Sequence, residues 1–520
     1  MSLIVDTLVR DLHDLLPDLG NNGGLMSPSI YDTAQALRLT PPKGRVLVKN
    51  KYRIEEEDEV WPVVRWLLGQ QQADGGWGSP FSPLSRTVPT LASVLALKEY
   101  CTRRTTQEAV EEGLTFLRRQ LSHWNKEVPD DLPVGAELML PRLLEDAAAK
   151  DVLLHQAPYR ALLELGRKRR AMIAAAKPGA GTTAAYSWEA WGATPDPAII
   201  DGTGGVGHSP AATAAWIAAT QYKPHLADYR ERAKQYMKMA AAATSENIIG
   251  VLPTAWPITR YEQAFGLYAL LVGEIHTLPA LQDVMAPQLD DLARALRPQG
   301  LGFSDDFIAD GDDTAAAVAI LKATGRDVDL GLLEQYQSDE YFLGYPGELQ
   351  PSVSLTARGV HALQLFGKDV SRWWPLLVRH QRMDGSWAGD KWNSSWLYTT
   401  CHVLIALQGS PFKDAIREAV HALRVFQFED GGWGMIDRST TVETAYAVLA
   451  LHAMRNEDIL EERDLLMLRR GYEWLLNHYR PFRMKEYKCW LNKEIYCPQR
   501  IDRAYELSAM LAVTLGEPLP

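Results

Sequence analysis

A seven-residue pattern, Gln-x-x-Asp-Gly-x-Trp, constrains the fold of this chain more than any other feature. It occurs three times, from Gln71 to Trp77, from Gln381 to Trp387 and from Gln427 to Trp433. Each copy follows an apolar helical stretch, and Asp-Gly is a strong turn signal. The spacing of the last two copies matches two helices with their turns. Repeated helix pairs either stack into an array or close into a barrel.

The rest of the chain favours helices as well. Long Ala- and Leu-rich amphipathic segments dominate, and alternating strand patterns are scarce. The clearest predicted helices cover residues 90–100, 211–219, 314–322, 356–365, 441–454 and 502–515. We therefore predict an all-α protein built from antiparallel helix pairs.

Composition excludes several classes of protein. The 520 residues are 46% hydrophobic, which supports a large core, and the net charge of −11 argues against nucleic acid as a partner. The four cysteines show no metal-ligand spacing, which indicates a reducing compartment. No apolar run is long enough to span a bilayer, and the first residues do not read as a signal peptide. We expect a cytoplasmic protein without stable membrane insertion; its oligomeric state is open, a homodimer included.

Three carboxylates lie within four positions, at Asp310, Asp312 and Asp313. Like charges at this spacing raise at least one pKa, and burial among apolar side chains raises it further. A carboxylic acid that stays neutral in an aromatic pocket can protonate a carbon–carbon double bond. We assign that role to Asp312, with Asp310 and Asp313 orienting it and sharing its charge. The alternative is an ordinary helix start, because Asp favours the first turn of a helix.

These motifs together resemble the class II terpene cyclases, especially bacterial diterpene cyclases of the copalyl diphosphate synthase type. The likeness covers most of the chain. Besides the repeats, it rests on Ser27 to Ala34, Ser209 to Ala214, Asp310 to Thr314, Asp390 to Ser395, Glu443 to Tyr446 and Trp490 to Tyr496.

The resemblance implies two α/α-barrel domains, called β and γ, with the active site between them and no class I α domain. It places residues 1–45 and 270–520 in the β-type barrel that carries the Asp motif. Residues 46–269 would form the inserted γ-type barrel. The turn-rich segment at residues 41–50 would link the two.

The resemblance also implies a reaction. Geranylgeranyl diphosphate would be cyclised to a bicyclic labdane-type diphosphate, copalyl diphosphate, with the diphosphate retained; the ent form is preferred, and the normal and syn forms stay open. Alternatives are a farnesyl diphosphate cyclase that makes a drimane and an enzyme that makes a halimane or clerodane by a later quench. A squalene- or hopanoid-type cyclase would be longer and carry an apolar membrane segment. A non-catalytic helical-barrel binding protein is a further alternative.

Substrate-binding residues follow from the same resemblance. Lys391 and Lys493 are the expected diphosphate ligands, although most lysines are simply surface residues. Aromatic rings can stabilise cationic carbons. The candidates for the cavity wall, each of which could equally be ordinary core, are Trp188, Trp191, Trp256, Tyr261, Phe265, Tyr341, Phe342 and Trp396.

The remaining expectations concern a metal and a base. The acidic stretch around Glu57 and Asp58 lies where the family carries an acidic motif associated with Mg²⁺, and carboxylate oxygens suit Mg²⁺. Five acids in a row are also typical of a solvated face.

His208 and His402 are candidates for the base that ends the cascade, with a packing role as the alternative.

Overall fold

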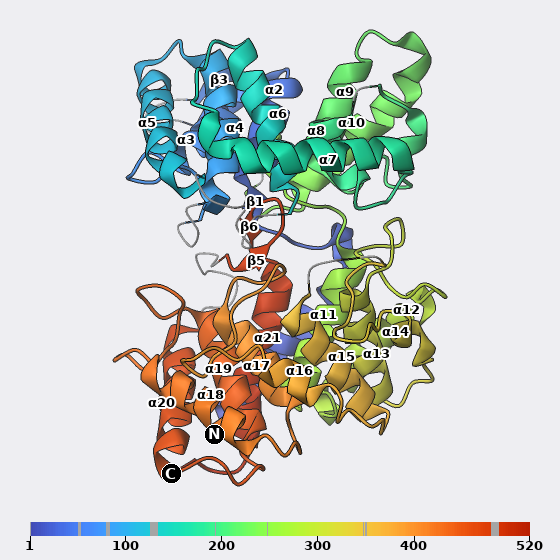
Figure 1. The fold of residues 1–520 in the computed structure, drawn as a ribbon, viewed down its shortest axis with the longest axis vertical. Helices are drawn as coiled ribbons and strands as arrows, with labels where there is room; N and C mark the ends of the chain where they lie inside the picture. Colours follow the sequence, from blue (N-terminus) through green and yellow to red (C-terminus); the bar gives the residue numbers. More distant parts are fainter. Residues whose placement is uncertain are drawn as a thin grey trace.

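The protein folds into two helical lobes, one above the other in Figure 1. The computed structural model describes residues 2–49, 54–79, 84–124, 134–192, 194–246, 248–346, 348, 351–479 and 488–519. Both chain ends lie in the lower lobe, and the blue-to-green part of the chain forms the upper one (Figure 1). The fold is therefore all-α with two lobes, as predicted.

The lower lobe is a closed ring of inner helices surrounded by outer ones. Each inner helix packs against the next, and the last packs against the first. The inner helices are α11 (Thr259–Val272), α13 (Gly311–Ala323), α15 (Val353–Leu365), α17 (Trp396–Ala406), α19 (Thr441–Ala453) and α21 (Gln499–Leu515). The outer ones are α1 (Ser2–Leu15), α12 (Gln282–Ala295), α14 (Gly331–Glu334), α16 (Trp374–Val378), α18 (Lys413–Val425) and α20 (Glu462–His478). This is an α/α barrel.

The upper lobe repeats the plan with a smaller ring. Its inner helices are α2 (Ile30–Leu39), α4 (Thr87–Leu97), α6 (Ala136–Ala149), α8 (Trp188–Trp191) and α9 (Pro210–Thr220). Its outer helices are α3 (Val60–Gly69), α5 (Arg104–Gln120), α7 (Arg160–Ala176) and α10 (Ala227–Ala242). Three short antiparallel strand pairs complete the described fold: β1 (Pro28–Ser29) with β4 (Leu252–Pro253), β2 (Arg45–Lys49) with β3 (Ile54–Asp58), and β5 (Trp490–Leu491) with β6 (Ile495–Tyr496).

Burial explains which helices are inner and which are outer. In α19 every residue from Thr441 to Leu451 is buried, so the helix has no solvent face. In α18 the buried residues lie on one face, which is typical of a helix that covers a core. Among the described residues, no helix has both the length and the apolar character needed to cross a membrane.

The domain boundaries differ from the prediction. Helix α2, expected in the lower barrel, packs against α4 and α9 in the upper one, and α11 packs against α13 and α21 in the lower one. The chain passes between the lobes beside β1 and β4, which pair with each other. The segment at residues 41–50 is not a linker: Arg45 to Lys49 form β2. The turn residues there suggested a boundary, but the apolar face of α2 completes the upper core.

The three repeats make the same turn between an outer and an inner helix. In each, the Gln side-chain amide donates to the glycine carbonyl of its own turn and to a carbonyl of the next outer helix. These acceptors are Gly75 (2.9 Å) and Ala109 (2.9 Å), Gly385 (2.8 Å) and Ala415 (2.7 Å), and Gly431 (2.8 Å) and Met467 (3.0 Å). The glycines have positive φ angles of 88°, 86° and 98°, which favour glycine.

The tryptophan of each repeat joins the turn to both helices. Its indole N–H donates to the end of the preceding outer helix, and its backbone N–H donates to a threonine hydroxyl of the following inner helix. The acceptors are Leu67 and Thr90 for Trp77, Leu377 and Thr400 for Trp387, and Leu423 and Thr444 for Trp433. The pattern is therefore a structural device that ties outer helices to the ring.

Replacing the repeat glutamine should destabilise the protein. In Gln71→Ala two carbonyls lose their donor, so we expect a loss of about 1–3 kcal/mol, seen as a lower Tm. Gln72→Ala is the matched control, because the Gln72 amide lies at the surface and should change stability by less than about 0.5 kcal/mol. Equal Tm values for the two variants would contradict the structural role.

Candidate active site

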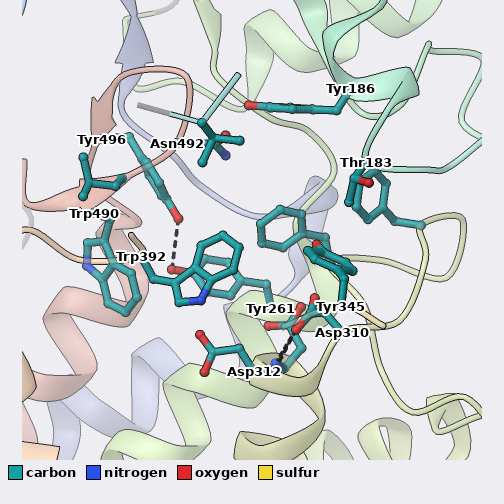
Figure 2. A pocket seen from close by; sticks show the side chains of 15 residues that line it. Thr183, Tyr186, Tyr261, Asp310, Asp312, Tyr345, Trp392, Trp490, Asn492 and Tyr496 are labelled. Carbon is teal, nitrogen blue, oxygen red and sulfur yellow. Dashed lines mark hydrogen bonds between the residues drawn. The ribbon is translucent and has the colours of Figure 1, made fainter. Parts of the chain in front are cut away.

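A cavity lies where the two lobes meet. Figure 2 shows the acidic residues at one end and Tyr186 and Asn492 at the other. The lining residues are Val134, Thr183, Tyr186, Tyr261, Phe303, Phe307, Asp310, Asp312, Asp313, Tyr345, Trp392, Trp490, Leu491, Asn492 and Tyr496. Val134, Thr183 and Tyr186 come from the upper lobe, so the cavity exists only when both lobes are in place.

The predicted acid motif forms the first turn of α13 and faces this cavity. Asp310 is the N-cap residue, and its Oδ1 accepts hydrogen bonds from the backbone N–H groups of Asp312 (2.9 Å) and Asp313 (2.8 Å). Carboxylates are favoured caps because they satisfy these otherwise free donors. Helix start and acid cluster are thus the same feature, and the cap fixes all three carboxyl groups at the cavity wall.

Burial raises the pKa of each carboxyl in the cluster. It raises the pKa of Asp310 to about 7, against the backbone donors that favour the anion. The pKa of Asp313 lies well above its usual range because of burial and the neighbouring charges of Asp310 and Asp312. Within the described residues, Asp313 Oδ2 is buried without a hydrogen-bond partner. The cluster therefore retains protons at neutral pH.

Asp312 differs from its neighbours in having a cationic partner. Arg358 on α15 forms an ion pair with Asp312 Oδ1. Burial raises the pKa of Asp312, and the Arg358 charge opposes this rise. The Asp312 side chain is 14% exposed, and the other two residues are buried. Asp312 thus presents the most accessible carboxyl of the cluster, with a cation in place to stabilise its anion.

Arg358 is a functional candidate that our sequence reasoning missed. Its side chain is 0% exposed, and its guanidinium also donates to the Tyr398 hydroxyl. The guanidinium carbon lies 4.5 Å from the Phe265 ring centre and 5.3 Å from that of Tyr268. The available signal was a lone arginine in an otherwise uncharged predicted helix. Such a residue is either on a solvated face or paired inside the core.

Aromatic rings form most of the remaining wall. The Tyr496 hydroxyl donates to the Tyr261 hydroxyl at 3.2 Å, the contact dashed at the centre of Figure 2. Tyr261 also meets Trp490 edge to face, with ring centres 5.9 Å apart. Of the aromatic candidates from the sequence, Tyr261 alone is among the described lining residues.

The other seven candidates are absent from the described lining, and three of them, assigned to substrate binding, have other surroundings. Trp396 packs against Phe426 beside a separate surface hollow. Trp256 packs on Tyr236 in the upper lobe, and the hydroxyl of Tyr341 approaches the Glu348 carbonyl. Which face of its element a residue occupies decides whether it reaches the cavity, and composition carries no such information.

Neither predicted diphosphate ligand lines the cavity. Lys391 forms an ion pair with Glu348, and its charge acts on Asp312, so it lies at the acid end. The diphosphate is at the opposite end of the substrate from the alkene that an acid would protonate. Lys493 is 0% exposed and donates to Glu189 Oε1 at 2.7 Å and to Ser209 Oγ at 2.6 Å. Both assignments are therefore corrected.

The predicted metal residues do not fit a Mg²⁺ site. Glu57 pairs with Arg65 at 2.7 Å and lies 3.6 Å from Arg103. The Asp58 side chain is 63% exposed and lies near Arg45. No group of acids, histidines and cysteines suited to a metal occurs in the described part of the chain. The guanidinium partners leave no net negative charge at Glu57, so the solvated-face alternative describes this segment better.

The two histidine candidates for the base also lie outside the described lining. The His208 ring is in contact with Asp201 Oδ2 at 3.1 Å and Ser304 Oγ at 2.6 Å, so both ring nitrogens are engaged. Burial lowers the pKa of His402 well below its usual range, and its ring stacks in the barrel interior on Tyr268. Both histidines have structural partners that explain their positions.

Comparisons with known proteins agree with this geometry. A family model, the squalene-hopene cyclase C-terminal domain, matches residues 349–487. The chain is 59% identical to (+)-kolavenyl diphosphate synthase from Herpetosiphon aurantiacus, covering 99% of each chain. It is 29% identical to ent-copalyl diphosphate synthase from Streptomyces sp. KO-3988, over 98% of this chain and 95% of that one.

A solved structure shares the whole architecture. It is ent-copalyl diphosphate synthase from Streptomyces platensis, with a TM-score of 0.79, 27% identity and coverage of 97% of this chain and 99% of that chain. Two α/α barrels, an acid cluster between them and relatives that match over nearly their full length lead to one conclusion: the chain belongs to the class II diterpene cyclases.

Proposed function

We propose that this enzyme converts geranylgeranyl diphosphate to a clerodane-type diphosphate of the kolavenyl kind, with the diphosphate retained. The observation that carries this proposal is the 59% identity to (+)-kolavenyl diphosphate synthase over 99% of both chains. The copalyl product expected from the motifs is supported only by the more distant relatives. The alternative from the sequence analysis, a clerodane formed by a later quench of the cation, therefore replaces the copalyl product in this proposal.

Asp312 starts the reaction in this proposal. Its proton forms a new C–H bond at the terminal alkene, and the electron pair of that double bond is consumed, which leaves a tertiary cation. Neighbouring double bonds attack in turn and close two rings. The Arg358 guanidinium, already paired with Asp312 Oδ1, stabilises the carboxylate left behind. Asp310 fixes this helix turn by accepting hydrogen bonds from the backbone N–H groups of Asp312 and Asp313, and Asp310 and Asp313 share the charge of the cluster.

The walls of the cavity favour a late quench. A clerodane differs from a labdane by hydride and methyl shifts that precede loss of the final proton. Aromatic faces stabilise the migrating cation without supplying a strong base. Among the described lining residues, the acid motif holds the only carboxyl groups, and no histidine is present. A cation that meets no base early has time to rearrange.

Mg²⁺ stays part of the proposal as a counter-ion of the diphosphate. Cations neutralise this group in most enzymes that bind it. Because Glu57 and Asp58 do not fit a metal site, we assign it no ligands and no step.

Product identification tests the proposal directly. Purified protein incubated with geranylgeranyl diphosphate and Mg²⁺ should give one clerodane alcohol after enzymatic dephosphorylation, identified by mass spectrometry and chiral comparison with standards. A run in D₂O should place one deuterium at the former terminal alkene, because the proton comes from an exchangeable acid. A labdane product would contradict the clerodane assignment, and turnover of farnesyl diphosphate alone would contradict the C20 substrate.

Asp312→Asn should abolish cyclisation without unfolding the protein. The amide keeps the shape of the side chain but has no acidic proton, so we expect the rate to fall by at least about 10²- to 10⁴-fold. Substrate binding, measured by calorimetry, should persist. The control is Asp414→Asn, since the Asp414 side chain is 95% exposed on α18. Turnover within a few-fold of wild type in Asp312→Asn would contradict the assignment.

The rate of cyclisation should fall on the alkaline side. The acid cluster must hold its proton, and burial raises the pKa of Asp310 to about 7, so activity should decline above about pH 7 instead of near the ordinary pKa of Asp. Removing the guanidinium in Arg358→Gln should raise the pKa of Asp312 and move this decline to higher pH, while Arg358→Lys should move it less. An unchanged profile in Arg358→Gln would show that Arg358 does not act on the acid.

A further inference from the structure

The hairpin formed by residues 490–496 belongs to one lobe by sequence and contacts the other at its tip. Its strands β5 and β6 lie between α20 and α21, both in the lower barrel, and Figure 1 shows them at the junction of the lobes. Trp490 pairs with Tyr496 and Leu491 with Ile495. The tip residues Asn492, Lys493 and Glu494 are buried, although hairpin tips are usually exposed.

The tip makes charged contacts with the upper lobe. Lys493 Nζ donates to Glu189 Oε1 on α8 at 2.7 Å and to Ser209 Oγ, the N-cap of α9, at 2.6 Å. Glu494 accepts from the Ile30 N–H at 3.0 Å and the Tyr31 N–H at 2.7 Å, at the start of α2. The hairpin thus joins three inner helices of the upper ring.

The strands of the hairpin are fixed to the lower lobe and form part of the cavity wall. The Trp490 indole donates to Asp502 Oδ1 at 2.8 Å, and the Leu491 N–H donates to the Trp392 carbonyl at 2.8 Å. Trp490, Leu491, Asn492 and Tyr496 all line the cavity. Any displacement of the tip therefore opens this wall.

Lys493 and Glu189 depend on each other. Both side chains are almost fully buried, at 0% and 1% exposure, so an unpaired charge on either would be costly. Each group lies on a different lobe, and the pair forms only when the lobes meet as they do here. The Lys493 ammonium also lies 4.3 Å from the ring of Tyr186, which lines the cavity.

We propose that the Lys493–Glu189 pair is a positioning pair that holds the hairpin against the upper lobe and keeps water from the final carbocation. This inference rests on the proposed function and concerns how the reaction ends. With the hairpin in place, the rearranged cation loses a proton to the carboxylate that the first step left in the acid cluster, so an olefin forms and the acid is restored. With the hairpin displaced, a water oxygen bonds to the cationic carbon and then loses a proton to solvent, which gives a hydroxylated diphosphate.

The product ratio of Glu189→Gln tests this proposal. The variant should still consume geranylgeranyl diphosphate, because Asp312 is untouched, but the ratio of alcohol to olefin should rise by about tenfold or more. The alcohol should carry ¹⁸O when the reaction runs in H₂¹⁸O. Lys493→Met should act in the same way, and the double variant should be no worse than either single one. Loss of stability alone would lower yield without changing this ratio.

Two further variants keep the test decisive. Glu231→Gln removes an exposed carboxylate that pairs with Lys234 on α10, and it should leave the ratio unchanged. Glu189→Asp keeps the charge and should give a smaller rise, which decides the matter if Glu189→Gln does not fold. An olefin-only product in the Glu189 and Lys493 variants, alongside a cyclising wild type, would overturn the inference. A wild type that does not cyclise would instead overturn the proposed function.

Discussion

The ion pair between Arg358 and Asp312 is the interaction on which the proposed chemistry depends. A guanidinium does not lose its proton in proteins, and here it is fully buried. Three buried carboxyl groups beside one fixed cation approach neutrality when they hold two protons among them. Burial favours that state, since it raises the pKa of all three carboxyl groups, and because the three groups share their protons one of them is available at Asp312. A proton is thus stored next to a cation that lowers the cost of giving it away.

The two rings make this arrangement rigid. Helices α13 and α15 are neighbours in the lower ring, so ring closure sets the distance between Asp312 and Arg358. In each repeat turn, the glutamine amide donates to two backbone carbonyls and so joins the turn to the next outer helix. The hairpin of residues 490–496 joins the two lobes. The architecture positions the acid cluster at one end of a cavity lined mostly by aromatic residues, and the hairpin forms part of its side wall. The sequence motifs mostly serve this positioning.

Part of this account could be predicted from sequence. The acid motif, its place at a helix start and the helical repeat all have local signals, because caps and turns depend on neighbouring residues.

Arg358 and Glu189 were missed because their partners lie on other elements or in the other lobe. Lys493 was misassigned for the same reason: a lysine near an active site suggests a ligand until its buried partner is seen. Trp396 on α17, and Trp256 and Tyr341 in bends outside the helices, show that the orientation of a residue on its helix or loop decides whether it faces the cavity. The proposed product class rests on similarity to a relative, since relatives with the same overall likeness are named for different products.

The protonation state of the cluster can be measured by infrared difference spectroscopy of wild type against Asp312→Asn at about pH 6, some two units above the ordinary pKa of Asp. The account predicts a carbonyl band of a protonated carboxylic acid that shifts in D₂O and is weaker in the variant. A spectrum in which Asp312 contributes only carboxylate bands would contradict it.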